Sequence, residues 1–367
     1  MKAHTRSRRS RLTQASIGTA MVLASLTVAL LAAEFAVRLL GSGERRWEFG
    51  NFIENPRLLA RGWRTMQHDT GLGYVPRPGY SEVDSESGKV LTFDENGLRA
   101  HRRLHSESLD ETSPVLAVGD SYAMGEQAAD DETWPVYLEG MIDRRVLNGG
   151  VSGYGIDQAV LRAERLVPIV RPGVLLVSFI ADDVNRARMR ILWGVDKPYF
   201  DIERGTLVLR NVPVKLPRVD ARLDPVRRVL GYSFLVDAVM RRLKLTAYWS
   251  YDQPSYFEPA HDQGERVACL LMDRLRRLGE TYGMQVLVVA QYTPNAWLQA
   301  PAFQHEVQVA ENLLACARAN QLQTLDTRPG LEAAVRTDGV WRYYFSGHMN
   351  DAGNRLTATM IAHQLGW

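Results

Sequence analysis

Several kinds of site are missing from this sequence. The 367 residues include only two cysteines, and the eight histidines show no metal-ligand spacing such as His-x-x-x-His. There is no phosphate-binding loop, no dinucleotide-binding fingerprint and no internal repeat. We therefore expect neither a metal nor a cofactor.

The two cysteines, Cys269 and Cys316, both fall on predicted helices. Export to an oxidising compartment would permit a disulfide between them. Two isolated buried thiols fit the sequence equally well, because neither their distance nor their orientation can be read from it. Both possibilities stay open.

The sequence also lacks a basic stripe of the kind that binds nucleic acid. Residues 1–12 carry five cations and no acid: Lys2, Arg6, Arg8, Arg9 and Arg11. Without these five charges the formal net charge of +2 becomes about -3, so the excess of basic residues lies in the tail. We expect no nucleic-acid partner.

Charge is absent from 13 to 33, a run of 21 residues that is long enough to span a bilayer. The helical pattern continues to Leu40, so residues 13–40 are predicted to form a single transmembrane anchor. A cleaved signal peptide is the alternative, but its apolar core would be shorter and no Ala-x-Ala follows residue 20. The positive-inside rule leaves residues 1–12 in the cytoplasm, which predicts an inner-membrane protein whose remaining chain is periplasmic or extracytoplasmic.

Residues 41–112 form a predicted connector with short strands and turns at 71–79 and 90–97. Two arrangements of the connector are considered. It either forms a surface hairpin that spaces the following domain from the membrane, or packs against that domain or edges its cleft.

From residue 113 to the end, short apolar runs alternate with helical patterns. This alternation predicts an α/β domain, a three-layer sandwich with right-handed crossovers around a parallel sheet. The predicted strands are 115–118, 145–147, 174–180, 285–292 and 322–326, and the predicted helices are 133–142, 156–167, 265–282, 304–320 and 352–365.

The first of these strands runs directly into Gly119, Asp120 and Ser121. Ligands of parallel sheets bind at the carboxyl ends of the strands, and the N–H groups of a helix amino terminus can hold an anion there. A serine at this point meets the requirements of a nucleophile with half of an oxyanion hole. A capped strand-to-helix turn without chemistry is the alternative.

Three blocks in the same order resemble those of the SGNH (GDSL-type) serine hydrolases. The resemblance covers about 113–367, and the matching residues are Gly119, Asp120 and Ser121, then Gly153, then His348 with Asn350 and Gly353. It implies a flavodoxin-like sheet, Ser121 as nucleophile, His348 as base, and an oxyanion hole that includes the N–H groups of Ser121 and Gly153. Membrane-anchored relatives have a Gly-Leu-Arg before the catalytic domain that resembles residues 97–99.

Two positions depart from the family pattern. Asp182 stands where the family has an oxyanion-hole asparagine, so either Asp182 is protonated in a dry pocket, or Asn185 replaces it, or the hole is weak. The triad acid is also replaced, because Phe345 and Ser346 occupy its positions before the histidine. Asp338 and Asp351 are near in sequence, and the acid stays unassigned.

An insertion at about 186–262 is rich in aromatic residues and arginines. A lid over the active site and a packed subdomain are both compatible with its composition. Residues 225–245 have a helical pattern with five basic residues, which would suit sugar rings or acidic lipid headgroups.

Together these features predict a membrane-anchored serine esterase or O-acyltransferase that acts on an acylated glycan or lipid of the cell envelope through Ser121 and His348. Water as acceptor gives deacylation and a sugar hydroxyl gives acyl transfer, and the sequence does not choose between them. The alternative is a catalytically impaired domain of the same fold that binds a glycan or a partner protein. The residues at 182 and 346 favour this alternative.

Overall fold

The structure, a computed structural model, describes residues 3–40, 47, 65–84, 87–100, 110–215, 224–245, 249 and 257–367. The chain divides into two compact units. One combines residues 1–60 with 218–254, and the other combines 61–217 with 255–367.

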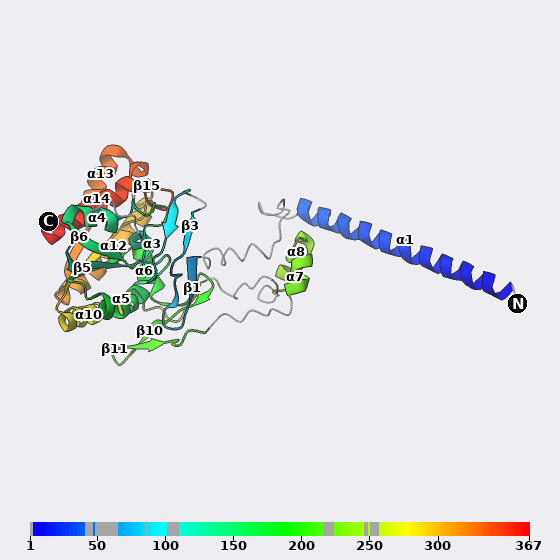
Figure 1. The fold of residues 1–367 in the computed structure, drawn as a ribbon, viewed down its shortest axis with the longest axis horizontal. Helices are drawn as coiled ribbons and strands as arrows, with labels where there is room; N and C mark the ends of the chain where they lie inside the picture. The colour runs from blue at the N-terminus through cyan, green and yellow to red at the C-terminus, as the bar shows by residue number, and fades with distance from the viewer. Residues whose placement is uncertain are drawn as a thin grey trace. The chain divides into compact units, whose positions relative to one another are not determined.

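The larger unit is built on a five-stranded sheet in which every neighbouring pair is parallel (Figure 1). In chain order the strands are β5 (Asp110–Val118), β6 (Arg144–Asn148), β7 (Val174–Phe179), β13 (Gln285–Ala290) and β14 (Gln323–Asp326). Across the sheet the order is β14-β13-β7-β5-β6, which is the flavodoxin-like order 2-1-3-4-5. The predicted fold class is confirmed.

Helices cover both faces of this sheet, and each face has its own apolar core. On one face, Val115 and Leu176 pack with α4 (Trp134–Ile142) and α14 (Asp351–Leu365). On the other, Leu116 and Val177 pack with α5 (Ile156–Val170), α10 (Gly264–Tyr282) and α12 (Ala300–Ala319). Figure 1 shows α4 and α14 on one side of the sheet and α5 and α10 on the other.

The apolar runs form strands because both of their faces are covered. All six residues of β7 are buried, which explains why its sequence shows no alternation of polar and apolar residues. The five strands and five helices predicted after residue 113 are all present, with boundaries within a few residues. Elements that the sequence analysis did not predict are short helices and hairpins, together with one longer helix: α3 (Ser121–Met124), α6 (Ala181–Arg186), α11 (Asn295–Leu298), α13 (Arg328–Asp338), η4 (Val340–Arg342), β15 (Tyr344–Phe345) and β16 (His348–Met349).

The described part of the connector is packed against the larger unit. It forms two antiparallel pairs, β1 (Met66–Asp69) with β2 (Gly73–Pro76) and β3 (Ser81–Val83) with β4 (Val90–Thr92). Tyr74 and Phe93 share an apolar core with Met124 and Tyr154. Of the two arrangements considered, the packed one is observed, and the free surface hairpin is wrong for these residues.

The insertion is divided between the two units. Residues 186–217 and 257–262 belong to the larger unit, with strands β8 (Met189–Leu192), β9 (Val195–Asp196), β10 (Tyr199–Glu203), β11 (Thr206–Arg210) and β12 (Phe257–Pro259). Lys197 Nζ lies 2.5 Å from a carboxylate oxygen of Asp157, and both side chains are buried. This ion pair joins the insertion to α5. Three aromatic residues of the insertion, Tyr248, Tyr251 and Tyr256, lie outside the described residues.

The smaller unit contains α1 (Ala3–Leu40), α7 (Asp224–Leu230) and α8 (Phe234–Arg242). Within α1, Ile17–Leu40 is long and apolar enough to serve as a membrane anchor or a signal sequence. The side chains of the basic tail, residues 1–12, lie outside the described part of the chain.

Cys269 on α10 and Cys316 on α12 form a disulfide, with their Cα atoms 5.3 Å apart. Of the two possibilities left open by the sequence, the disulfide is observed. It links two neighbouring helices on one face of the sheet.

Candidate functional site

Ser121 lies at the carboxyl end of β5, as the first residue of α3. Asp120 caps this short helix, because its Oδ1 accepts a hydrogen bond of 2.9 Å from the backbone N–H of Tyr122. A Cβ atom at Gly119 would lie 2.5 Å from the carbonyl oxygen of Ser178 on the neighbouring strand. The close approach of the two strands therefore requires glycine just before the Asp-Ser pair.

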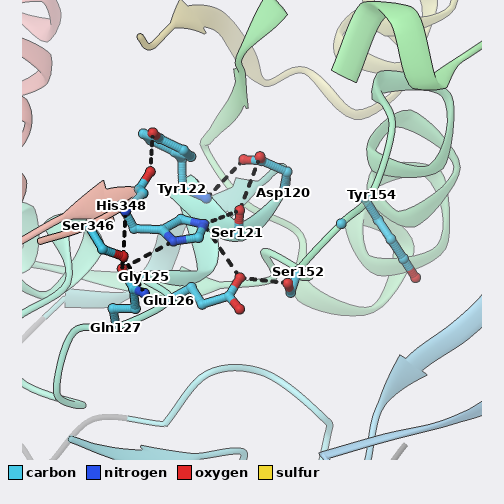
Figure 2. Close-up of polar contacts among 12 residues, drawn as sticks. Asp120, Ser121, Tyr122, Gly125, Glu126, Gln127, Ser152, Tyr154, Ser346 and His348 are labelled. Atoms are coloured by element: carbon cyan, nitrogen blue, oxygen red, sulfur yellow. Dashed lines mark hydrogen bonds and ion pairs between the residues drawn. The ribbon is translucent and has the colours of Figure 1, made fainter. Parts of the chain in front are cut away.

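His348 comes to Ser121 from the other end of the chain. It follows the turn of the β15–β16 hairpin, and the hydroxyl of Tyr122 donates a hydrogen bond of 2.8 Å to the carbonyl of Gly347 in that turn. His348 Nε2 lies 2.9 Å from Ser121 Oγ, across a separation of 227 residues (Figure 2). The side chain of Asn350 then caps α14 by accepting from the N–H of Gly353.

The other ring nitrogen of His348 faces an amide. Nδ1 lies 3.3 Å from Oε1 of Gln127, and Nε2 of Gln127 donates to Oγ of Ser346 over 3.0 Å (Figure 2). Gln127 is buried and has a φ of 65°. Its amide oxygen can accept only a proton held on Nδ1, so Nε2 is the nitrogen left to accept from Ser121.

The two aspartates near His348 in sequence are engaged elsewhere. Asp338 accepts a hydrogen bond of 2.5 Å from the hydroxyl of Tyr343, and Asp351 accepts from the hydroxyl of Tyr137. Neither aspartate is hydrogen-bonded to the ring of His348, whose Nδ1 partner among the described residues is Gln127.

A carboxylate does approach the imidazole, from the side that faces Ser121. Glu126 Oε2 lies 3.5 Å from His348 Nε2 and accepts a hydrogen bond of 2.6 Å from Ser152 Oγ. Figure 2 shows the carboxylate of Glu126 between the His348 ring and Ser152. Two residues adjacent in sequence thus lie beside the two ring nitrogens of His348: Glu126 beside Nε2 and Gln127 beside Nδ1.

Behind Ser121, two buried carboxylates share one arginine. The guanidinium of Arg186 lies 2.7 Å from Asp183 and 3.6 Å from Asp120, whose Oδ2 is 3.3 Å from Ser121 Oγ. Burial, together with the charge of Asp120, raises the pKa of Asp183 well above its usual range, and burial also raises the pKa of Asp120. Burial alone would lower the pKa of Arg186, but the two carboxylates outweigh it and raise that pKa.

The predicted oxyanion-hole residues are only partly gathered. Gly153 has a φ of 73°, and its carbonyl accepts a hydrogen bond from Nε1 of Trp193. Among the described residues, neither the N–H of Ser121 nor that of Gly153 has an acceptor. Gly153 is not among the residues that line the pocket described below.

Asp182 lines the pocket, and its side chain is 65% exposed, 3.9 Å from Arg186. The dry environment considered for Asp182 is therefore wrong. Asn185 does not line the pocket and instead accepts a hydrogen bond of 2.8 Å from Arg188. The structure therefore does not support Asn185 as a substitute for the family asparagine. The side chain next to Asp182 that brings positive charge to this wall of the pocket is Arg186.

Ser121 and His348 open into a pocket of about 310 Å³. Its lining combines polar and apolar groups, and one aromatic ring, Trp341, is 58% exposed. The lining residues are Ser121, Tyr122, Ile180, Asp182, Arg186, Thr293, Pro294, Asn295, Trp341, Ser346, Gly347 and His348. Among the described residues, no group of three or more His, Cys, Asp or Glu side chains is arranged to hold a metal ion.

Of the described residues of the insertion, Arg186 alone lines this pocket. A lid formed by the rest of the insertion stays a prediction. The sequence analysis missed Glu126, Gln127 and Arg186 as site residues. Glu126 and Gln127 follow Ser121 by five and six residues, and this proximity was the only signal in the sequence.

No family model matches this chain, and no curated protein matches it. Among solved structures, the chain is similar to an acetylxylan esterase from Geobacillus stearothermophilus, with 12% identity, a TM-score of 0.41, and coverage of 70% of this chain and 95% of that one. It is also similar to an α/β hydrolase enzyme from the metagenome of Lake Arreo, Spain, with 11% identity, a TM-score of 0.43 and the same coverage. These values establish neither a common family nor a common substrate.

Proposed function

We propose that this chain is a membrane-anchored serine esterase or O-acyltransferase of SGNH type, with Ser121 as nucleophile and His348 as general base. The observation that carries the proposal is the distance of 2.9 Å between Ser121 Oγ and His348 Nε2 at the floor of a pocket. This distance is within the range for proton transfer from a nucleophile to its base. A structural role alone gives no reason for an imidazole to meet a serine at the carboxyl edge of the sheet.

In the acylation step, Ser121 Oγ attacks the ester carbonyl carbon while His348 Nε2 takes the hydroxyl proton. The tetrahedral intermediate collapses when His348 returns this proton to the leaving alcohol oxygen, which leaves the acyl group on Ser121. Water or a sugar hydroxyl then gives its proton to His348 and attacks the acyl-serine. The products are a free acid or a new ester, and Ser121 regains its proton.

Gln127 and Glu126 together take the two roles that the acid has in a Ser-His-Asp triad. In a Ser-His-Asp triad the carboxylate holds the imidazole in one tautomer and stabilises its charged form. Gln127 serves the first purpose through its hydrogen bond to Nδ1. Glu126 serves the second, because its carboxylate lies 3.5 Å from Nε2 and attracts the imidazolium that forms when Ser121 loses its proton.

We assign the oxyanion to the N–H groups of Ser121 and Gly153, as the resemblance implies. Asp182 does not donate a hydrogen bond when ionised, so this hole has one donor fewer than the family pattern. Arg186 supplies positive charge at the same wall of the pocket. We expect this arrangement to be slower than one with an asparagine donor.

The pocket favours an acylated glycan over an acylated lipid as substrate. Asp182, Thr293 and Asn295 offer hydrogen-bonding groups to sugar hydroxyls, and the exposed ring of Trp341 offers a face for a sugar ring to stack on. A long acyl chain would need a larger apolar lining than these residues supply. Both water and a sugar hydroxyl remain compatible with the site as acceptor.

The proposed location is the inner membrane, with α1 crossing it once and the catalytic unit on the periplasmic or extracytoplasmic side. Two features support it. The basic residues of 1–12 favour the cytoplasm, and the Cys269–Cys316 disulfide is of a kind that forms in oxidising compartments.

A binding module without activity is the second candidate. Asp182 at the oxyanion wall favours it, as does an amide, in place of a carboxylate, as the partner of His348 Nδ1 within the described part of the chain. Such a module would bind a glycan or a partner protein and turn over no ester.

Hydrolysis of p-nitrophenyl acetate by the full chain in detergent separates the two candidates. An esterase loses turnover in both Ser121→Ala and His348→Ala, and a fluorophosphonate probe labels Ser121 in the parent only. Ser81→Ala and His363→Ala are matched controls, since both side chains are exposed and lie outside the pocket. No turnover and no labelling in the parent would leave the binding module.

A further inference from the structure

The C-terminal end of α1 holds a second helix through a carboxylate. Glu34 accepts hydrogen bonds from the N–H groups of Phe234 (2.8 Å) and Leu235 (2.9 Å) and from Ser233 Oγ (2.7 Å). Arg38 donates to the same carboxylate over 2.7 Å, and its guanidinium lies over the ring of Phe234. Glu34 therefore caps the amino terminus of α8, which lies beside the end of α1 (Figure 1).

The position of Glu34 along α1 sets the depth of α8, if α1 is the membrane anchor proposed above. The uncharged residues 13–33 rise about 31 Å as a helix, which matches the hydrocarbon thickness of about 30 Å. Glu34 and Arg38 follow directly, so they fall in the headgroup region on the far side of the membrane. A helix capped by Glu34 lies at that same level.

α7 and α8 expose apolar side chains along one side of each helix. On α7 these are Val226, Val229 and Leu230, spaced as i, i+3 and i+4. At α8 they are Val239 and, at the C-cap, Leu243, which are spaced as i and i+4. Val229 is 73% exposed and Leu243 is 60% exposed. Water is a poor environment for such a surface, and the lipid boundary beside α1 is a good one.

The same segment is basic. Residues 224–245 contain five cations and two acids, and Arg228, Arg241, Arg242 and Lys244 are exposed. An apolar side next to a basic side is typical of helices that lie in a membrane interface and bind anionic lipids.

We infer that α7 and α8 lie on the extracytoplasmic face of the membrane, with their apolar side chains among the acyl chains and their basic side chains on anionic phospholipid headgroups. This inference rests on the anchoring part of the proposed function and not on its catalytic part. Because Glu34 joins α8 directly to α1, the apolar and basic surface of α7 and α8 extends the membrane contact of the anchor. The segment is thus a second membrane contact in place of an active-site lid.

Single cysteines carrying the fluorophore NBD test the inference in the full chain, reconstituted in vesicles of phosphatidylethanolamine and phosphatidylglycerol. The chain's two cysteines are joined in a disulfide, so an introduced cysteine is the one reactive thiol. Val229→Cys and Leu243→Cys should be quenched by nitroxide lipids that probe about 5–10 Å below the headgroups, and protected from aqueous iodide. Ile169→Cys, at an exposed site of 76% on the larger unit, should be quenched by iodide alone.

Two further measurements separate the possible failures. Val22→Cys, in the middle of α1, should be quenched by nitroxide lipids; if it is not, the proposal that α1 crosses the membrane is refuted. Turnover of p-nitrophenyl acetate in the same vesicles tests the catalytic proposal independently. Replacing Arg242 and Lys244 by Gln, or using phosphatidylcholine vesicles, should lower the ratio of lipid-shielded to exposed probe at Val229, by roughly fivefold for each charge lost.

Iodide quenching at Val229 and Leu243 in the presence of a shielded Val22 would overturn the inference. Protection from iodide without quenching by nitroxide lipids would also overturn it, because a protein surface would then cover these helices.

Discussion

The amide oxygen of Gln127 lies 3.3 Å from Nδ1 of His348, where a Ser-His-Asp triad has a carboxylate. Gln127 is held there by burial and by its second hydrogen bond, to Ser346. A neutral amide fixes the tautomer of the ring but contributes no charge, so the proposed mechanism takes orientation from Gln127 and charge stabilisation from Glu126.

Gln127→Ala should lower kcat by roughly tenfold to a hundredfold and leave KM nearly unchanged. A ring without its Nδ1 acceptor loses part of the factor of about 10²–10⁴ that general acid–base catalysis contributes. Gln127→Glu should recover the rate, because a carboxylate accepts the same proton. Steady-state kinetics on p-nitrophenyl acetate provides both constants.

Gln127→Gly is the control for folding. It removes the same side chain but relieves the φ of 65°, so it should unfold no more readily than the parent while it shows the same loss of kcat. Full activity in the alanine and glycine variants would refute the positioning role of Gln127.

Asp182→Asn should raise kcat/KM about threefold to tenfold. The change removes a negative charge beside the developing oxyanion and adds a donor, but the exposed side chain is screened by water, so the gain should fall short of the factor of about 10²–10³ known for buried donors. Asn185→Ala is the matched control, because Asn185 lies outside the pocket and should leave kcat/KM unchanged. The measurement uses p-nitrophenyl acetate, which has no sugar hydroxyl for the carboxylate to bind. A loss of rate on this substrate in Asp182→Asn would therefore contradict this account of the oxyanion.

Much of the fold could be predicted because its signals are local. The apolar run that becomes β7 and the Gly-Asp-Ser turn after β5 each fit a single type of element. The meeting of Ser121 and His348 was implied by the resemblance of three motifs to the SGNH pattern. The rule for parallel strands accounts for Ser121 after β5 but not for His348, which lies in the antiparallel β15–β16 hairpin.

The rest depends on contacts between distant residues. Nothing in the sequence places Gln127 against His348, because its backbone turn and its hydrogen bond to Ser346 arise only when the hairpin closes. Likewise, composition left a lid and a packed subdomain both open for the insertion at about 186–262, whereas hydrogen bonds to Glu34 join α8, which lies within it, to α1. The Cys269–Cys316 pairing depends on how α10 packs on α12, which spacing along the chain does not specify.

The buried carboxylates behind Ser121 should make the chain less stable as the pH rises from about 4. Burial and the charge of Asp120 raise the pKa of Asp183. Between the pKa of the unfolded chain and the higher folded value, the folded chain binds more protons, so its free energy of unfolding falls with rising pH. Asp183→Asn should flatten this slope in urea unfolding curves measured from pH 4 to 7, where one pKa unit corresponds to about 1.4 kcal/mol.

Asp69 provides a control of opposite sign. Burial acts to raise the pKa of Asp69, but the hydrogen bonds from Arg165 and from the N–H of Gly71 outweigh it and lower that pKa. Its contribution to stability is therefore present at neutral pH and lost as the pH falls through the folded value. Asp69→Asn should destabilise the chain at pH 7 and have little effect at low pH; the same slope change in both variants would contradict the assignment to Asp183.

Removing the disulfide should destabilise the larger unit by about 4 kcal/mol. The bond closes a loop of 47 residues, and the loop-entropy relation gives this value for the constraint that it places on the unfolded chain. The double variant Cys269→Ala/Cys316→Ala should therefore unfold at a lower urea concentration than the oxidised parent, and the reduced parent should match the variant. A thiol reagent should modify the native chain only after reduction. Equal unfolding midpoints for the oxidised parent and the double variant would show that the packing of α10 on α12 holds these helices without the bond.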